Sequence, residues 1–147
     1  MAFEFAYQLG YGAEPLVRTF TAGGEVAKGL PVKIASKKIA VIDSGDEPIG
    51  VSLSAAAEDG DPITVLLSPD ALYWVPIDTS DGQTKDDVDE DDISSVFDVD
   101  SSDKGLIDAD TDTEGDVLIF DFKDDGETAL VLLNLHALRI GKDSGGE

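Results

Sequence analysis

Short segments of β-forming residues, separated by glycine, proline and aspartate, run through this sequence and leave little room for helices. Within these segments apolar residues alternate with polar ones or form brief runs, and the spacing of an amphipathic helix is nearly absent. The segments cover residues 3–7, 16–20, 31–35, 38–42, 49–53, 63–67 and 72–77. The pattern predicts an all-β fold. We also expect a tight turn at Ser36 and Lys37, and no more than a turn or two of helix in residues 54–58.

The composition changes sharply after residue 77. Residues 78–92 are polar and largely acidic, with a nearly continuous run of acids in residues 86–92. Like charges in such a run repel one another and resist packing, so we interpret it as a linker or exposed loop, with room for a short helical turn in residues 88–93.

The β pattern resumes beyond the acidic run. Residues 95–100 alternate, and residues 117–122 and 128–133 flank a five-residue loop that contains Gly126. This spacing predicts a β-hairpin in which the glycine supplies a positive φ. A last apolar segment covers residues 135–140.

Together these patterns predict two small β modules. The first, a β-barrel or β-sandwich, spans residues 1–78 and begins with an N-terminal arm in residues 1–12. An acidic linker, residues 79–94, leads to a second small β module in residues 95–141 and a flexible tail in residues 142–147. The chain has 147 residues, and cores this small gain stability from a partner surface.

Charge restricts the partners of the chain. It has 32 acidic residues against 10 basic ones, a formal net charge of −22. Such a surface repels phosphate backbones, so we expect no nucleic-acid partner. Short hydrated carboxylates also suit a protein that stays soluble in concentrated salt, where repulsion is screened. A halophilic source and an ordinary acidic surface both fit this composition.

Few residues suited to catalysis are present. The chain has no cysteine and a single histidine, His136, which lies in an apolar context. It also lacks the G-x-S-x-G, Walker A and G-x-G-x-x-G motifs. We therefore expect no catalytic residues and a non-enzymatic protein.

The sequence gives no sign of a membrane partner. No apolar run approaches the ~20 residues of a membrane span, and the first ten residues do not resemble a signal peptide. We expect the host cytoplasm, or a particle assembled there, as the location.

One acidic cluster resembles the start of a calcium-binding loop. Asp108, Asp110 and Asp112 occupy the first, third and fifth positions of an EF-hand pattern. Thr113 then stands where glycine is needed, and Ile119 where a bidentate glutamate is needed. A looser cation site that includes Asp116 stays open, so the expectation is either no cofactor or Ca²⁺ at this cluster.

Aromatic and aliphatic residues near the start of the chain are candidates for contacts with a neighbour. Residues 1–12 are apolar and carry one charge, on Glu4. Tyr73 and Trp74 are either core residues or interface anchors, since both residue types favour buried contact patches. The predicted contact residues are Phe3, Phe5, Tyr7, Leu9, Tyr11, Tyr73 and Trp74.

Three blocks of the first half resemble a known family. They are Ala22-Gly23-Gly24-Glu25-Val26-Ala27-Lys28-Gly29-Leu30-Pro31-Val32, then Glu47-Pro48-Ile49-Gly50-Val51-Ser52-Leu53-Ser54-Ala55-Ala56-Ala57-Glu58-Asp59-Gly60, then Asp61-Pro62-Ile63-Thr64-Val65-Leu66-Leu67 with Tyr73-Trp74-Val75. Across residues 20–75 their order and spacing are similar to those of small capsid decoration proteins of tailed phages and viruses. Residues 91–99, 105–108 and 117–133 are similar to a second β module that follows this domain in some of these proteins. The acidic run goes beyond the family pattern.

The resemblance implies a role. It implies a structural virion protein, a β-barrel or β-sandwich that forms a homotrimer and binds the major capsid protein on the outer surface of the capsid. A competing hypothesis is a calcium-binding extracellular adhesion module, which would use the aspartate cluster.

Overall fold

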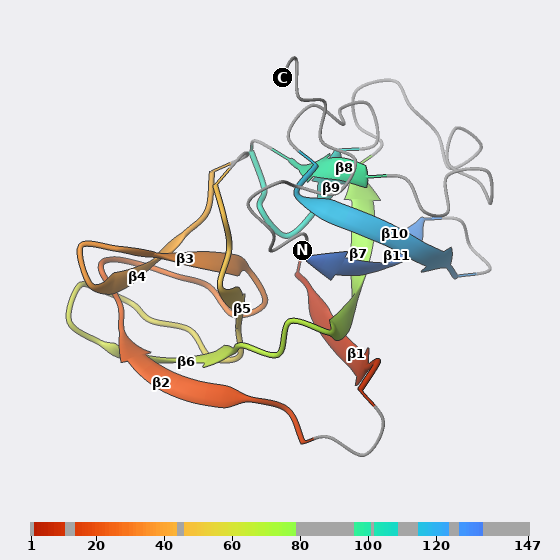
Figure 1. The fold of residues 1–147 in the computed structure, drawn as a ribbon. Coiled ribbons are helices and arrows are strands. Elements are labelled where there is room, and N and C mark those ends of the chain that lie inside the picture. The colour runs from red at the N-terminus through yellow and green to blue at the C-terminus, as the bar shows by residue number, and fades with distance from the viewer. Residues whose placement is uncertain are drawn as a thin grey trace, which may run out of the picture.

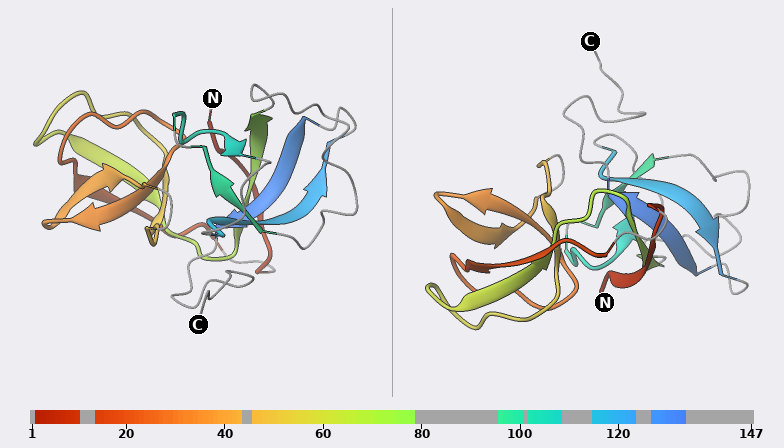
Figure 2. Two further views of the ribbon diagram at one scale, coloured as in Figure 1. Left: turned by 90° about the horizontal axis from the view of Figure 1, so that it is seen from above. Right: turned by 60° about the horizontal axis from the view of Figure 1, so that its bottom comes forward.

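The computed structural model describes residues 2–10, 14–43, 46–78, 96–100, 102–108, 115–123 and 127–133. Within these ranges the chain forms eleven strands and no helix, which confirms the predicted all-β fold. The strands are β1 (Glu4–Gln8), β2 (Val17–Thr21), β3 (Pro31–Ala35), β4 (Lys38–Val41), β5 (Gly50–Ser52), β6 (Pro62–Leu66), β7 (Ala71–Asp78), β8 (Val96–Val99), β9 (Ile107–Asp108), β10 (Val117–Phe122) and β11 (Thr128–Leu133). Figures 1 and 2 show them in two bodies that lie side by side.

Five strands form the first body, which we call the first barrel. Their order in the sheet is β2-β6-β5-β3-β4. The sheet curls until its two ends meet, where Ala22 forms a parallel bridge with Ile39 and the Gly23 N–H donates to the Ile39 carbonyl at 2.8 Å. Its interior holds Ala22, Val26, Val32, Ile39, Ala56, Ile63 and Val65.

The second body is also closed, and we call it the second barrel. Its sheet has the order β1-β7-β11-β10-β8-β9, and β9 pairs in parallel with the end of β7. This extra pairing joins β7, β11, β10, β8 and β9 into a ring. Strand β1 lies outside the ring, along the first half of β7 and on the same side as β9.

The two barrels do not follow the predicted division of the chain, which places the first module before residue 79 and the second after residue 94. Strands β1 and β7 belong to the range predicted as the first module, yet both pair with the sheet of the second barrel. Residues 4–8, which lie within the predicted arm of residues 1–12, form an edge strand that pairs with β7. The linker 79–94, residues 134–141 and the tail 142–147 lie outside the described residues.

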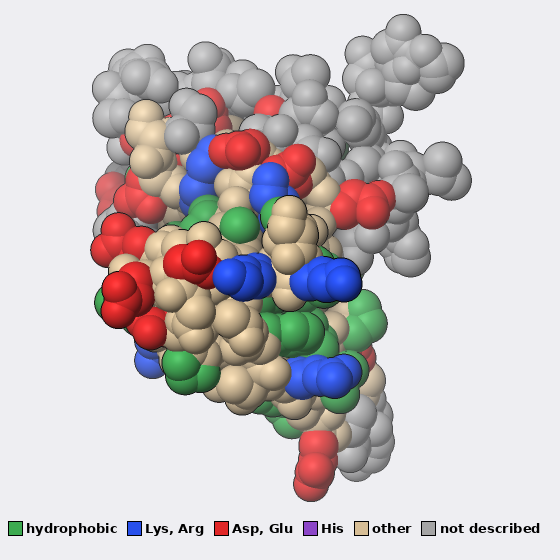
Figure 3. Space-filling model, turned by 90° about the vertical axis from the view of Figure 1, so that its left-hand side faces the viewer, with side chains coloured by type: hydrophobic (Ala, Val, Ile, Leu, Met, Phe, Trp, Pro, Cys, Tyr) green, Lys and Arg blue, Asp and Glu red, His purple; other side chains and the backbone are tan. Residues whose placement is uncertain are grey.

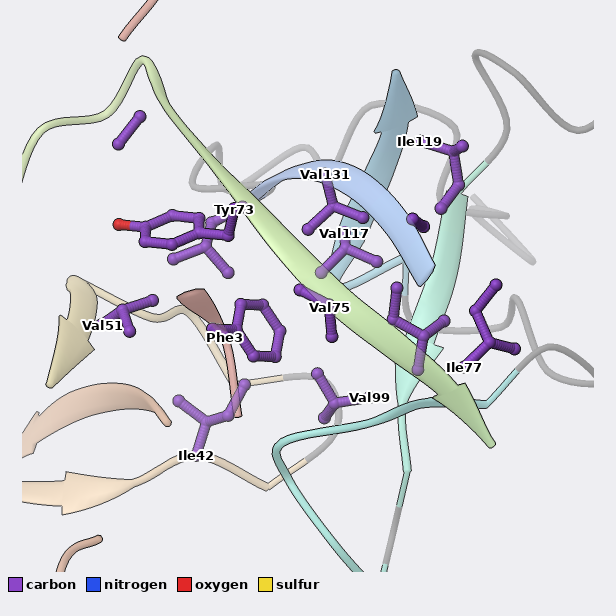
Figure 4. Close-up of a cluster of buried hydrophobic side chains, with 14 of the residues drawn as sticks. Phe3, Ile42, Val51, Tyr73, Val75, Ile77, Val99, Val117, Ile119 and Val131 are labelled. Atoms are coloured by element: carbon purple, nitrogen blue, oxygen red, sulfur yellow. The ribbon is translucent and has the colours of Figure 1, made fainter. Parts of the chain in front are cut away.

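One apolar cluster joins the two barrels. Ile42, Val51 and Leu66 of the first barrel pack with Phe3 and with the interior of the second barrel. Figure 4 shows Phe3 and Tyr73 between the first-barrel side chains and Val75, Val99 and Val117. Shared burial of this kind favours folding of the two barrels as a unit.

Two local predictions are confirmed. The hairpin strands span residues 117–122 and 128–133, as the alternation predicts. Ser36 and Lys37 form the turn between β3 and β4 with φ values of 51° and 68°, the left-handed pair of a two-residue hairpin turn. Residues 54–58 form no helix; within them Ala56 bridges to Val26.

Candidate functional site

Two of the predicted contact residues belong to the core. Phe3 is 3% exposed and Tyr73 is 1% exposed, and their rings meet edge to face with centroids 5.9 Å apart. Because both side chains are buried in the cluster between the barrels, neither can anchor a partner in this conformation. For these two residues the interface interpretation is wrong.

The hydroxyl of Tyr73 is buried without a hydrogen-bond partner, the one side-chain polar atom of this kind among the described residues. Burial raises the pKa of the Tyr73 phenol. Tyrosine in an unfolded chain titrates near pH 10, so the stability held by the neutral phenol is present below about pH 10 and is lost as pH rises toward the raised folded-state pKa.

Tyr73→Phe is therefore expected to leave the free energy of unfolding unchanged or to raise it by about 1 kcal/mol at neutral pH, because it removes an unpaired buried hydroxyl. Above about pH 10 the variant should lose less stability than the wild type, and denaturant midpoints across this range measure the difference. The difference in stability between the variant and the wild type reports Tyr73 alone. Lys33, whose pKa is raised mainly by its hydrogen bond to Asp46, contributes equally to both proteins. A variant several kcal/mol less stable at neutral pH would show that the hydroxyl has a partner.

Trp74 faces the opposite side of β7 from Tyr73 and is half-buried. The Lys123 ammonium lies 5.0 Å from the centroid of its indole ring, a cation–π contact. Part of the ring thus stays accessible on the outside of the second barrel.

Tyr7 is exposed on β1, and Leu9 is exposed just after the strand ends. Phe5 pairs with Tyr73, Tyr7 pairs with Leu72, and a β-bulge separates the two pairs. Because directly paired residues share a face, the bulge places Tyr7 on the face opposite Phe5. Leu9 follows Tyr7 by two positions. Tyr11, the remaining predicted contact, lies outside the described residues.

The connection between β6 and β7 holds the end of β1 beside the start of β2. Asp70 accepts hydrogen bonds from the backbone N–H groups of Leu9, at 3.0 Å, and Gly10, at 2.7 Å. Two residues earlier, the Ser68 hydroxyl accepts one from the Leu16 N–H at 2.7 Å. Segments that are separated along the chain are thereby brought to one region of the surface.

We call the resulting apolar area the connector surface. Its members are Tyr7, Leu9, Leu16 and Val17, with 50%, 49%, 58% and 44% of their surface exposed. Sequence reasoning missed Leu16 and Val17, because an apolar strand gives no sign of which of its residues remain uncovered.

Charge is sparse around the connector surface. Residues 5–24 carry two charged side chains, Glu14 and Arg18, and residues 62–70 carry one, Asp70. Residues 1–70 hold ten acids and five basic residues, whereas residues 71–147 hold 22 acids and five basic residues. In Figure 3, which shows the first-barrel side, hydrophobic and basic side chains lie together at the lower right, with one acidic side chain projecting below them, and most acidic ones lie toward the left and upper edges. An acidic partner therefore meets less like charge along these residues than along the acid-rich second half of the sequence.

The aspartates predicted as cation ligands are only partly described. Asp116 is fully buried and its Oδ2 accepts the Val99 N–H at 3.0 Å, while Asp98 accepts the Gly115 N–H at 2.8 Å. These bonds tie β8 to the segment before β10. Asp108 is also described, and Asp110 and Asp112 lie outside the described residues. Across the described ranges, no group of three or more His, Cys, Asp or Glu side chains is placed to hold a metal ion.

A groove of about 480 Å³ lies along the seam between β1 and the first barrel. Its lining residues are Ala2, Phe3, Glu4, Phe5, Lys28, Gly29, Ser52 and Leu53. The Ser52 hydroxyl donates to the Ala27 carbonyl at 2.7 Å and accepts from the Leu30 N–H at 3.1 Å. These bonds give Ser52 a structural role, holding the turn before β3.

No protein-family model and no curated protein matches the chain. Within the described residues, no helix has the length and apolar character needed to cross a bilayer.

Proposed function

We propose that this chain is a structural virion protein that decorates the outer surface of a tailed-virus capsid by binding the lattice of the major capsid protein. The observation that carries the proposal is the connector surface, an exposed apolar area on a protein with a net charge of −22. Exposed apolar side chains gathered in one region are typical of sites that another protein covers.

The connector surface can supply binding energy without an active site. Burying a large apolar side chain contributes about 1.5–3 kcal/mol, and a few such anchors usually dominate an interface. The acidic second half would then face the solvent, where its charge keeps decorated particles apart. The resemblance of residues 20–75 to decoration proteins supports the same role and the expected homotrimer.

The double variant Tyr7→Thr with Leu9→Ser tests this proposal. It removes two anchors and keeps a β-branched residue within β1. We expect affinity for capsids assembled from the major capsid protein of the same genome to fall about tenfold or more. Co-sedimentation with the particles measures the bound fraction.

Ile34→Ser is the matched control. Ile34 is 52% exposed on β3, outside the connector surface, so its replacement should leave capsid binding unchanged. Failure of the wild-type protein to bind the particles would contradict the proposed function. Equal losses in both variants would show that the connector surface is not the contact.

A further inference from the structure

The outer edge of β2 is open along its first residues. On its inner side β2 pairs with β6 over its whole length. On its outer side the end of β2 lies against β4. The described pairing between them is the parallel bridge from Ala22, the residue after β2, to Ile39, together with the bond from the Gly23 N–H. When the parallel register of that bridge is extended by two residues toward the start of β2, Phe20 falls opposite Lys37, at the tip of the β3–β4 turn. Residues 17–19 therefore extend beyond the hairpin and have no strand beside them among the described residues.

This edge carries few of the features that usually prevent a strand from pairing with another chain. Protected edges carry proline, charged side chains (lysine above all) or a bulge, and Arg18 is the single charged residue of β2. Residues 17–21 contain no proline and no lysine, and their register with β6 is unbroken. Val17, Thr19 and Thr21 are β-branched, which suits a paired strand. The edge is thus able to accept an additional strand.

Two positive charges lie at this edge. The Arg18 guanidinium carbon is 5.8 Å from the centroid of the Phe20 ring, a contact that holds its charge beside the strand. Lys37 lies at the hairpin tip, and no acidic residue occurs in residues 15–24. Arg18 and Lys37 thus make the first part of this edge positive on a chain with 32 acids. Asp59 and Asp61 lie at its other end, where Asp59 is paired with Lys38 at 2.6 Å.

We propose that the outer edge of β2 accepts an extended, acid-bearing segment of a partner protein as an added antiparallel strand. Main-chain hydrogen bonds would supply the affinity, and Arg18 and Lys37 would select carboxylate side chains. A second copy of this chain is a poorer occupant, because each copy brings a net charge of −22. The inference rests on the proposed function only for the identity of the partner, and the edge itself can be tested without particles.

The test uses a peptide with blocked ends, Thr-Glu-Val-Glu-Val-Thr, titrated into the isotopically labelled full chain. We expect saturable chemical-shift changes at the amides of residues 17–20. The same peptide with lysine in place of glutamate should bind about tenfold more weakly, because it reverses the charge. Arg18→Glu should weaken binding of the acidic peptide by a similar factor, whereas Lys28→Glu, the same charge change at an exposed lysine of the first barrel outside β2, should not.

Several results would overturn the inference. These are no saturable shifts in the wild type, shifts confined to other strands, equal binding of the two peptides, or a wild-type dimer that Arg18→Glu dissociates. Thermal unfolding of both variants checks that each is folded. Because the proposed function is measured on particles and the edge on a peptide, failure of one can be told apart from failure of the other.

Discussion

Replacing Gly50 with alanine is expected to destabilise the protein by about 3 kcal/mol or more, at the upper end of the cost of overpacking a core. A Cβ at this position would lie 1.9 Å from the Leu66 carbonyl oxygen and 2.9 Å from its carbon. Both contacts are to backbone, so no side chain can rotate away. Gly50 pairs with Val32 on β3 while its neighbour Val51 pairs with Leu66 on β6, and the methyl group would force β5 and β6 apart.

Gly24→Ala is the matched control for this substitution. A Cβ at Gly24 would meet no atom within 4 Å, so the free energy of unfolding should change by no more than about 0.5 kcal/mol. Denaturant unfolding of the two variants measures the difference. Similar stabilities would contradict the close approach of β5 to β6.

The same glycine lies in Pro48-Ile49-Gly50-Val51, part of the block of residues 47–60 from which the sequence predicts a family. The sequence alone shows the glycine but gives no reason for it. The reason lies in the packing of β5 against a strand more than ten residues away, which local patterns do not report.

Local strand patterns were predictable because each strand alternates over several residues. Residues 31–35 and the hairpin strands of residues 117–133 match their predicted bounds. Strand β9, Ile107–Asp108, was not predicted, because two residues are too few to show a period. It is a strand only because β7 and β8 lie on either side of it.

The candidate site was harder to predict than the strands. Alternation shows that neighbouring residues face opposite sides of a strand, but it cannot show which side another element covers. Phe3 is buried because its N–H bonds to the Gly29 carbonyl at 2.7 Å and the first barrel closes over it. Tyr7 is exposed because of a bulge that the sequence does not reveal.

Phe3→Ala is expected to lower the free energy of unfolding by about 3 kcal/mol, because it leaves a cavity where the two barrels meet. The Phe3 ring packs against Tyr73 and against residues of both barrels. A domain of this size has a total stability of about 5–15 kcal/mol, so the loss should be plain in the denaturant midpoint. Deleting residues 1–12 would cause the same damage, and loss of capsid binding by such a deletion would therefore not identify a contact.

Phe5→Ala provides the comparison that separates a core strand from a dispensable arm. Phe5 lies two residues after Phe3, within β1, its ring centroid is 6.3 Å from that of Tyr73, and it is 37% exposed. Its loss should cost about 1 kcal/mol, because part of its surface already meets water. A large loss of stability for Phe3→Ala and a small one for Phe5→Ala are expected if Phe3 anchors the start of the chain in the core. Small effects for both would mean that the start of the chain is an arm, as its sequence predicts, and that the barrels meet without it.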